Sequence, residues 1–452
     1  MKKKGKASKI ACVGLLASAL TFNNYSIMFD AKADTVSNSS ANSQVVILTK
    51  DSTVDRTIEQ FEDQNKDAAL TDVQEKIENK EIQVDVTDSS KDTVFDEDTS
   101  IFADATEVEG NSQYQKVLKQ ELNDGNRVFL YGDVSAEEYK DILGLDKITV
   151  DNDSAGDLEF GSSDDEIKSN IAEDKNSKVK EDEFFKDTES KFTSHIIGYT
   201  LDDSKELQFI DISVNNFDGD GKSIPNSESM LMQEVMSTQS EILDAENEHL
   251  ADEAENNKTS MIGVKKAHAT NVRVKDTYNL VAKGYRLGLL VARMDTDYHL
   301  YKQNSDGNKK YDYFTLKPVT QVHSYKGIWA GSILTDIDVP SDSDHLDTWA
   351  PMGDRGGAKM SVSLGFPFNI SAGMSFSESL VLDDRSSLAY DYARWQIKDS
   401  AIELNQNISG TTFNPVAGWA STGTYATVGL KVVGSFSNYI TLTTKTKVTY
   451  DY

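Results

Sequence analysis

The sequence contains a single cysteine, Cys12, among its 452 residues. This residue precedes the position where we expect a signal peptide to be cleaved, so the mature chain is predicted to contain no cysteine. A chain without thiols forms no disulfide, no thiolate nucleophile and no cysteine-ligated zinc site, which excludes several classes of enzyme. The mature protein must therefore draw its stability mainly from the burial of apolar side chains.

Basic residues are also scarce. The chain has 46 lysines and arginines against 75 aspartates and glutamates, which gives a net charge of -29. Proteins that bind nucleic acid neutralise its phosphates with clustered cations. The excess of acidic residues therefore excludes nucleic acid as the main partner.

Local catalytic signatures are missing as well. The sequence has neither a His-Glu-x-x-His nor a Gly-x-Ser-x-Gly motif, so zinc protease and serine esterase activities lack their usual signals. Four histidines are scattered along the second half of the chain, and we interpret each as structural or exposed: His268, His299, His323 and His345. Carboxylates for glycoside cleavage are available, and they are Asp336, Asp338, Glu378, Asp383 and Asp384. We expect a protein that is not an enzyme, with an extracellular hydrolase as an alternative.

The amino terminus has the pattern of a signal peptide. Five lysines within the first nine residues precede an apolar run over residues 10–22, and Ala31-Lys32-Ala33 supplies the small residues that a signal peptidase recognises. No later stretch reaches the roughly 18 uninterrupted apolar residues that a spanning helix needs. The sequence predicts a secreted, extracellular protein that is cleaved after Ala33.

Charge is distributed unevenly along the rest of the chain. Residues 34–260 contain 20 basic and 56 acidic residues, whereas residues 261–452 contain 20 basic and 18 acidic ones. We interpret this step as a domain boundary, with a polar linker over residues 251–260. The sequence thus predicts an acidic α+β domain over residues 34–250 and an all-β domain over residues 261–452.

The acidic half combines helical and strand patterns. Tyr114 and Leu118 keep helical spacing, residues 128–131 have the composition of a buried strand, and Ser135 with Glu138 forms a capping box for another helix. Further along, we expect a hairpin with arms at residues 195–200 and 207–214, and then a methionine-rich amphipathic helix from Met232 to about Leu250. The acid-rich residues 67–99 and 151–190 are expected to be mobile or poorly packed.

The second half has the pattern of successive strands. Asp306-Gly307 lies between two aromatic, β-favouring runs, which is a strong hairpin signal. The spacing of strands and turns predicts an antiparallel sandwich or open barrel of seven to ten strands.

One segment, residues 361–377, alternates strictly between apolar residues and small polar ones. Its even positions are apolar, and they are Val362, Leu364, Phe366, Phe368, Ile370, Ala372, Met374 and Phe376, while serine, glycine, proline and asparagine occupy the odd ones. This pattern resembles the serine-rich membrane-inserting hairpins of β-pore-forming toxins, which implies that one face meets lipid and the other water. The alternative, which we favour from the sequence, is a hairpin half-buried against a core.

Two acidic clusters have oxygen ligands at spacings that suit calcium. In the first, Asn216, Asp218 and Asp220 alternate before Gly221, and Glu228 follows one place later than the bidentate ligand of an EF-type loop should stand. The second consists of Asp342, Asp344 and Asp347. Calcium is the only cofactor that the sequence indicates.

These observations favour a secreted binding or surface-interaction protein. Its β domain contains all four tryptophans, and we expect this aromatic-bearing domain to contact a protein or glycan outside the cell. A β-pore-forming or membrane-damaging protein is the first alternative, and the hydrolase is the second.

Overall fold

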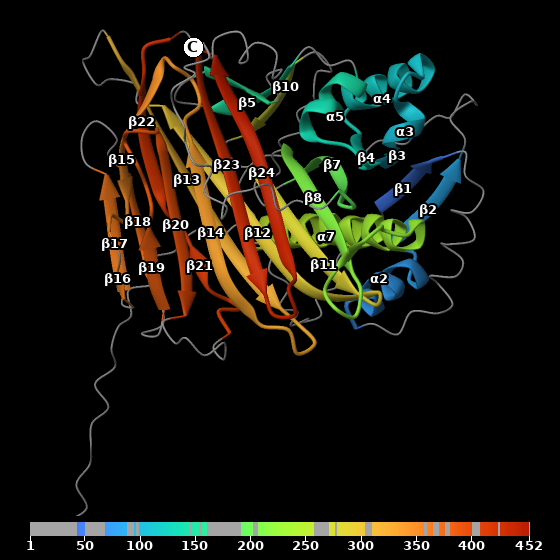
Figure 1. Cartoon of the computed structure of the whole chain (residues 1–452). Coiled ribbons are helices and arrows are strands. Elements are labelled where there is room, and N and C mark those ends of the chain that lie inside the picture. Colours follow the sequence, from blue (N-terminus) through green and yellow to red (C-terminus); the bar gives the residue numbers. More distant parts are fainter. Residues whose placement is uncertain are drawn as a thin grey trace, which may run out of the picture.

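The computed structural model describes residues 43–49, 68–87, 95, 99–143, 147–152, 156–160, 191–201, 207–256, 271–275, 278–302, 310–353, 355–356, 359–364, 370–375, 380–399, 407–423 and 425–451. Within these residues the chain is mainly β, with two large sheets and a few helices (Figure 1). The predicted signal peptide, residues 1–33, lies outside the described residues.

The larger sheet has thirteen strands in the part of the chain that is described. Their order is β15 (Asp344–Ala350), β22 (Val416–Ser421), β13 (Asp312–Ser324), β12 (Leu289–Lys302), β11 (Tyr278–Arg286), β8 (Leu207–Phe217), β7 (Ser194–Leu201), β4 (Arg127–Gly132), β3 (Ser100–Asp104), β1 (Ser43–Leu48) and β2 (Ile82–Thr87). Two short strands join it at the side, β21 (Thr412–Phe413) on β13 and β9 (Ser223–Ile224) on β8.

The second sheet has nine described strands. Their order is β10 (Asn271–Lys275), β5 (Lys147–Asn152), β6 (Gly156–Phe160), β24 (Thr441–Asp451), β23 (Tyr425–Phe436), β14 (Ala330–Asp338), β20 (Tyr392–Asp399), β19 (Leu380–Asp384) and β16 (Arg355–Gly356). A separate hairpin consists of β17 (Lys359–Leu364) and β18 (Ile370–Ser375).

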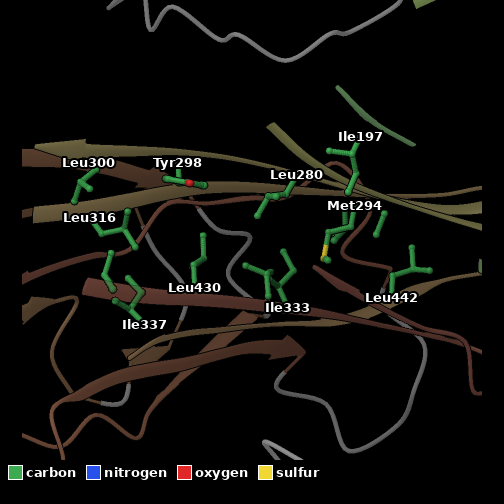
Figure 2. Close-up of a cluster of buried hydrophobic side chains, with 14 of the residues drawn as sticks. Ile197, Leu280, Met294, Tyr298, Leu300, Leu316, Ile333, Ile337, Leu430 and Leu442 are labelled. Atoms are coloured by element: carbon green, nitrogen blue, oxygen red, sulfur yellow. The ribbon is translucent and has the colours of Figure 1, made fainter. Parts of the chain in front are cut away.

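The main core lies between the two large sheets. Alternate residues of β12, such as Met294 and Tyr298, face alternate residues of β14 and β23, such as Ile333 and Leu430 (Figure 2). Each of these side chains is almost fully buried. Two sheets that bury one face each against the other make a sandwich, and the sequence prediction of a β-rich fold is confirmed.

Helices cover both faces of the amino-terminal strands. The helices α3 (Ala105–Val108), α4 (Ser112–Asp124) and α5 (Ala136–Ile142) contribute to the main core, while α2 (Ala68–Glu78) and α7 (Glu228–Asn256) pack on the opposite face in a second core cluster. Because both faces are covered, β1 and β4 are continuous apolar runs rather than alternating ones.

Local sequence signals located several elements correctly. The helical spacing from Tyr114 corresponds to α4, and the capping box of Ser135 and Glu138 is present at the start of α5. The expected hairpin is formed by β7 and β8. The methionine-rich helix is α7, but it continues to Asn256, so the first six residues of the predicted linker are helical.

The acid-rich segment over residues 67–99 is more ordered than predicted. It contains α2 and β2, and Val73 and Ile82 are 2% and 1% exposed. A few apolar residues are sufficient here because α2 needs only one face to pack on α7, and β2 gains a full ladder of parallel hydrogen bonds from β1. In the second acidic segment, β6 lies beside β24, whereas residues 161–190 lie outside the described residues.

The step in charge near residue 260 does not coincide with a break in either sheet. In the larger sheet β8 pairs with β11 in parallel, and in the smaller sheet β6 pairs with β24. The main core likewise contains residues from both sides of the step, such as Val46 and Leu442. The two halves therefore share one sandwich.

Candidate interaction surface

Four turns meet at one end of the sandwich, the lower end in Figure 1. They connect β8 to β9, β11 to β12, β13 to β14 and β23 to β24. We define the turn surface as residues 218–222, 286–289, 325–329 and 437–439.

Direct contacts hold these turns together. Ser437 N donates to Trp329 O at 2.8 Å, and Trp329 N donates to Ser437 Oγ at 3.0 Å. The guanidinium of Arg286 donates to Gly219 O, and Tyr325 N donates to Val291 O at 2.9 Å. The four turns thus form one connected structure.

Gly221 places the β8–β9 turn against the β23–β24 turn. Its φ is +80°, and a Cβ at this position would lie 1.8 Å from the carbonyl oxygen of Asn438. Only glycine satisfies both the left-handed backbone and this close approach.

The turn surface exposes large apolar side chains. Leu287 is 81% exposed and Tyr439 is 89% exposed. Three further side chains are exposed there to a smaller extent, and they are Leu289, Tyr325 and Trp329. Exposed apolar side chains that gather in one place mark contact sites more often than single ones do.

The backbone at two of these residues is unusual. Leu287 and Tyr439 have φ values of 53° and 61°, the left-handed region that glycine and asparagine favour. A bulky residue in this region costs free energy and, at such exposure, gains nothing from burial. Strained positions of this kind cluster at functional sites, so the two side chains are the strongest candidates for a binding role.

The turn surface has a small excess of cationic residues. It contains three cationic residues, Lys222, Arg286 and Lys326, against two acidic ones, Asp218 and Asp220. In a protein with a net charge of -29, this end is locally positive.

The first predicted calcium cluster lies in the β8–β9 turn. Asp218 Oδ1 accepts hydrogen bonds from the backbone N–H groups of Asp220 and Lys222, each at 2.9 Å, and the side-chain amide of Asn216 donates to Pro225 O at 3.3 Å. Glu228 is the first residue of α7. No group of three or more metal-binding side chains is found among the described residues, and calcium at this turn stays a prediction.

The three aspartates of the second predicted calcium cluster differ in burial. Asp344 is fully buried, and its carboxylate accepts hydrogen bonds from Ser343 Oγ at 3.1 Å and Thr427 N at 2.9 Å. Burial raises the pKa of this carboxyl group. Asp342 and Asp347 are exposed, so the three aspartates occupy different environments.

The alternating segment includes the hairpin β17–β18. Its register pairs Val362 with Ala372 and Leu364 with Ile370, so the even-numbered positions share one face. Leu364 is buried and belongs to the main core. Phe366, Phe368 and Phe376 lie outside the described residues, and Met374 is paired with Met360.

Three of the carboxylates considered for a hydrolase have structural partners. Asp336 accepts from Arg394 Nε at 2.9 Å, and Asp384 accepts from Trp349 Nε1 at 3.0 Å and from Gly353 N at 2.6 Å. Another is Asp383, which pairs with Lys398. Asp338 is the last residue of β14, and Glu378 is outside the described residues. These contacts favour structural roles for Asp336, Asp383 and Asp384.

The histidines are dispersed in the described structure. His299 and His323 lie on β12 and β13, and His345 lies on β15 at 3.6 Å from Asp391. His268 is outside the described residues. Sequence reasoning missed His195, which contacts Asp211 at 2.7 Å across the β7–β8 ladder.

A buried ionic cluster beneath α7 was also not predicted. Lys283 on β11 contacts Glu234 and Glu241 of α7, and Arg293 Nη1 lies 3.1 Å from Glu241 Oε1. Tyr285 donates to Glu234. Burial opposes ionisation of Glu241, but the charges of Arg293 and Lys283 outweigh it and lower its pKa to about 2. This cluster attaches α7 to the larger sheet.

Comparisons with known proteins assign no family. No family model matches the chain, and no curated protein matches it. Among solved structures, Clostridium perfringens delta-toxin is 9% identical over 38% of this chain and 87% of its own, with a TM-score of 0.25. A pore-forming protein is 12% identical over 38% of this chain and 85% of its own, with a TM-score of 0.23.

A third structure, the full-length major pilin SpaD from Corynebacterium diphtheriae, is 12% identical over 42% of this chain and 41% of its own, with a TM-score of 0.23. TM-scores this low carry no argument about this chain. Across the residues that the structure describes, no helix is both long and apolar enough to span a membrane.

Proposed function

We propose that this chain is a secreted surface-interaction protein that binds its partner through the turn surface. The observation that supports this most directly is the exposure of Leu287 and Tyr439 on left-handed turns. Neither side chain contributes to the core, and the backbone conformation disfavours both residues. A binding role accounts for their presence.

The opposite end of the sandwich provides a matched comparison. Leu388 and Tyr390 are 54% and 55% exposed. They lie near Asp338, the end of β14 that is remote from Trp329. At the usual rise per strand residue, the two ends of β14 are about 26 Å apart. Substitutions there test whether exposed apolar side chains matter wherever they occur.

Binding to intact cells tests the proposal. The turn variant, Leu287→Asn/Tyr439→Asn, replaces both side chains with a residue that tolerates the left-handed backbone. The opposite-end control is Leu388→Asn/Tyr390→Asn. Labelled mature chains are incubated with a panel of intact bacterial and animal cells, and the bound fraction is measured by flow cytometry.

We expect the wild type and the opposite-end control to bind the same cells. The turn variant should lose at least about tenfold in affinity, because burying a leucine and a tyrosine contributes more free energy than a tenfold change in affinity requires. Equal binding by all three proteins would show that the turn surface is not the contact site.

Secretion is part of the proposal. The basic stretch, the apolar run and Ala31-Lys32-Ala33 support export. Sequencing the amino terminus of the secreted protein should give Asp34 as its first residue. Retention of the full chain inside the cell would contradict the proposal.

A second candidate function, membrane damage by insertion of a hairpin, is favoured by the register of β17–β18. The apolar even positions share one face in that register, as a hairpin between lipid and water requires. Single cysteines at Val362 and Ser363 can carry an environment-sensitive dye, because the mature chain is predicted to be free of cysteine.

Insertion predicts that vesicles leak. It also predicts that the environment of a dye at position 362 becomes apolar, while a dye at position 363 remains exposed to water. Absence of leakage, with both dyes unchanged, would leave the hairpin as part of the sandwich.

A further inference from the structure

We propose that the partner of the turn surface is the headgroup region of a phospholipid bilayer. This inference rests on the proposed function, because it names the ligand of the same surface. Three features support it: the kinds of exposed side chain, their distribution over separate turns, and the local charge.

The exposed side chains suit the boundary between water and lipid. Trp329, Tyr325 and Tyr439 have an apolar ring with a polar group, which is the combination enriched at headgroup depth. Leu287 and Leu289 lack any polar group and gain from contact with the acyl boundary. A glycan would need hydrogen-bond partners beside the rings, and leucines supply none.

The exposed apolar side chains project from three separate turns, β11–β12, β13–β14 and β23–β24. Hydrogen bonds and the close approach of Gly221 to Asn438 hold these turns in position relative to one another. A bilayer accepts several separate projections because it is laterally fluid. A protein partner would need pockets that match each projection.

Charge complementarity points in the same direction. Lys222, Arg286 and Lys326 outnumber Asp218 and Asp220 on the turn surface, although the whole chain is strongly acidic. Phosphate groups of lipid headgroups attract cations close to the bilayer surface, and the attraction extends over about one Debye length. The acidic remainder of the protein is repelled, which orients this end toward the membrane.

Co-sedimentation with large vesicles tests the inference on the mature chain. Two compositions are compared, phosphatidylcholine alone and phosphatidylcholine with phosphatidylglycerol, each at low and high salt. The proteins are the wild type, the turn variant and the opposite-end control.

We expect the wild type to sediment with both vesicle types and more strongly with phosphatidylglycerol, and high salt to remove only that extra binding. The turn variant should bind at least about tenfold more weakly, because the apolar contribution of two large side chains is lost. The opposite-end control should bind like the wild type.

Other results overturn the inference in distinguishable ways. If the wild type fails to bind vesicles but binds cells through the turn surface, the proposed function survives and the partner is a protein or glycan. If the turn variant and the opposite-end control lose vesicle binding equally, the turn surface is not the lipid site. If neither cells nor vesicles are bound, both the inference and the proposed function fail.

Discussion

At the residue scale, the least predictable feature is Lys283. Lysine is seldom fully buried, so a lysine within strand β11 would be expected to face solvent. In the structure α7 covers it, and Glu234 and Glu241 compensate its charge. Burial disfavours the ammonium form, but these two carboxylates outweigh it and raise the pKa of Lys283. No local sequence signal connects residues on α7 with residues on β11, so this contact depends on the tertiary fold.

The cluster makes a prediction about stability. Lys283→Met leaves Glu234 buried without its cation, which should lower the free energy of unfolding by about 3–5 kcal/mol. The double variant Glu234→Gln/Lys283→Met removes both charges and should be destabilised less. Urea denaturation of the wild type and the variants measures the difference. The pair is not coupled if the loss of unfolding free energy in the double variant equals the sum of the losses in the single variants Lys283→Met and Glu234→Gln.

His299 makes a prediction about pH. Partial burial, together with the nearby charge of Lys317, lowers its pKa to about 4. The unfolded chain binds this proton near the ordinary pKa of about 6.5. Stability from the neutral imidazole is therefore present above pH 6.5 and is lost as the pH falls from 6.5 to 4.

His299→Gln should flatten the dependence of the unfolding free energy on pH in this window, by up to about 3 kcal/mol. Urea melts at several pH values between 4 and 7 measure the slope for both proteins. Parallel slopes would mean that His299 has an ordinary pKa in the folded state.

At the element scale, the sequence was most informative where local chemistry decides the conformation. The capping box of α5 and the β7–β8 hairpin depend on neighbouring residues, and both are present. The alternation of residues 361–377 indicated shared faces, and in the described part of this segment the register of β17–β18 pairs even positions with even positions. Composition was less reliable, because α2 and β2 form in an acid-rich segment through contacts with distant elements.

The β8–β9 turn carries the calcium prediction. Binding should raise the melting temperature of the mature chain in millimolar calcium, because it relieves the repulsion between Asp218 and Asp220. Asp218→Ala removes a carboxylate that accepts two backbone hydrogen bonds, so this variant should start less stable and should not respond to calcium. Asp342→Ala is the control at the other acidic cluster. The absence of a calcium effect on the wild type would leave Asp218 as a residue that only stabilises the turn.

At the scale of the whole molecule, charge and structure divide the chain differently. The acidic and neutral halves meet near residue 260, yet each of the two large sheets contains strands from both halves. The charge step follows from composition alone, whereas the sheet order depends on long-range pairing such as that of β8 with β11. The turn surface was likewise beyond sequence analysis, because its four turns are separated by many residues in the chain.

The shared core predicts one unfolding transition for the mature chain. Far-UV circular dichroism and tryptophan fluorescence should give the same urea midpoint, since all four tryptophans lie after residue 260 while many helical residues lie before it. A separately expressed fragment of residues 261–452 lacks β8, the partner of β11, and should be less stable than the whole chain. Two separate transitions would instead support the domain boundary inferred from charge.

The central claim is that the turn surface contacts the partner. Hydroxyl-radical footprinting of the mature chain, with and without the cells or vesicles that it binds, tests this claim without altering any residue. We predict protection of Leu287, Leu289, Tyr325, Trp329 and Tyr439, with Leu388 and Tyr390 as reactive as in the free protein. Protection of the second group, with the first group unchanged, would contradict the account.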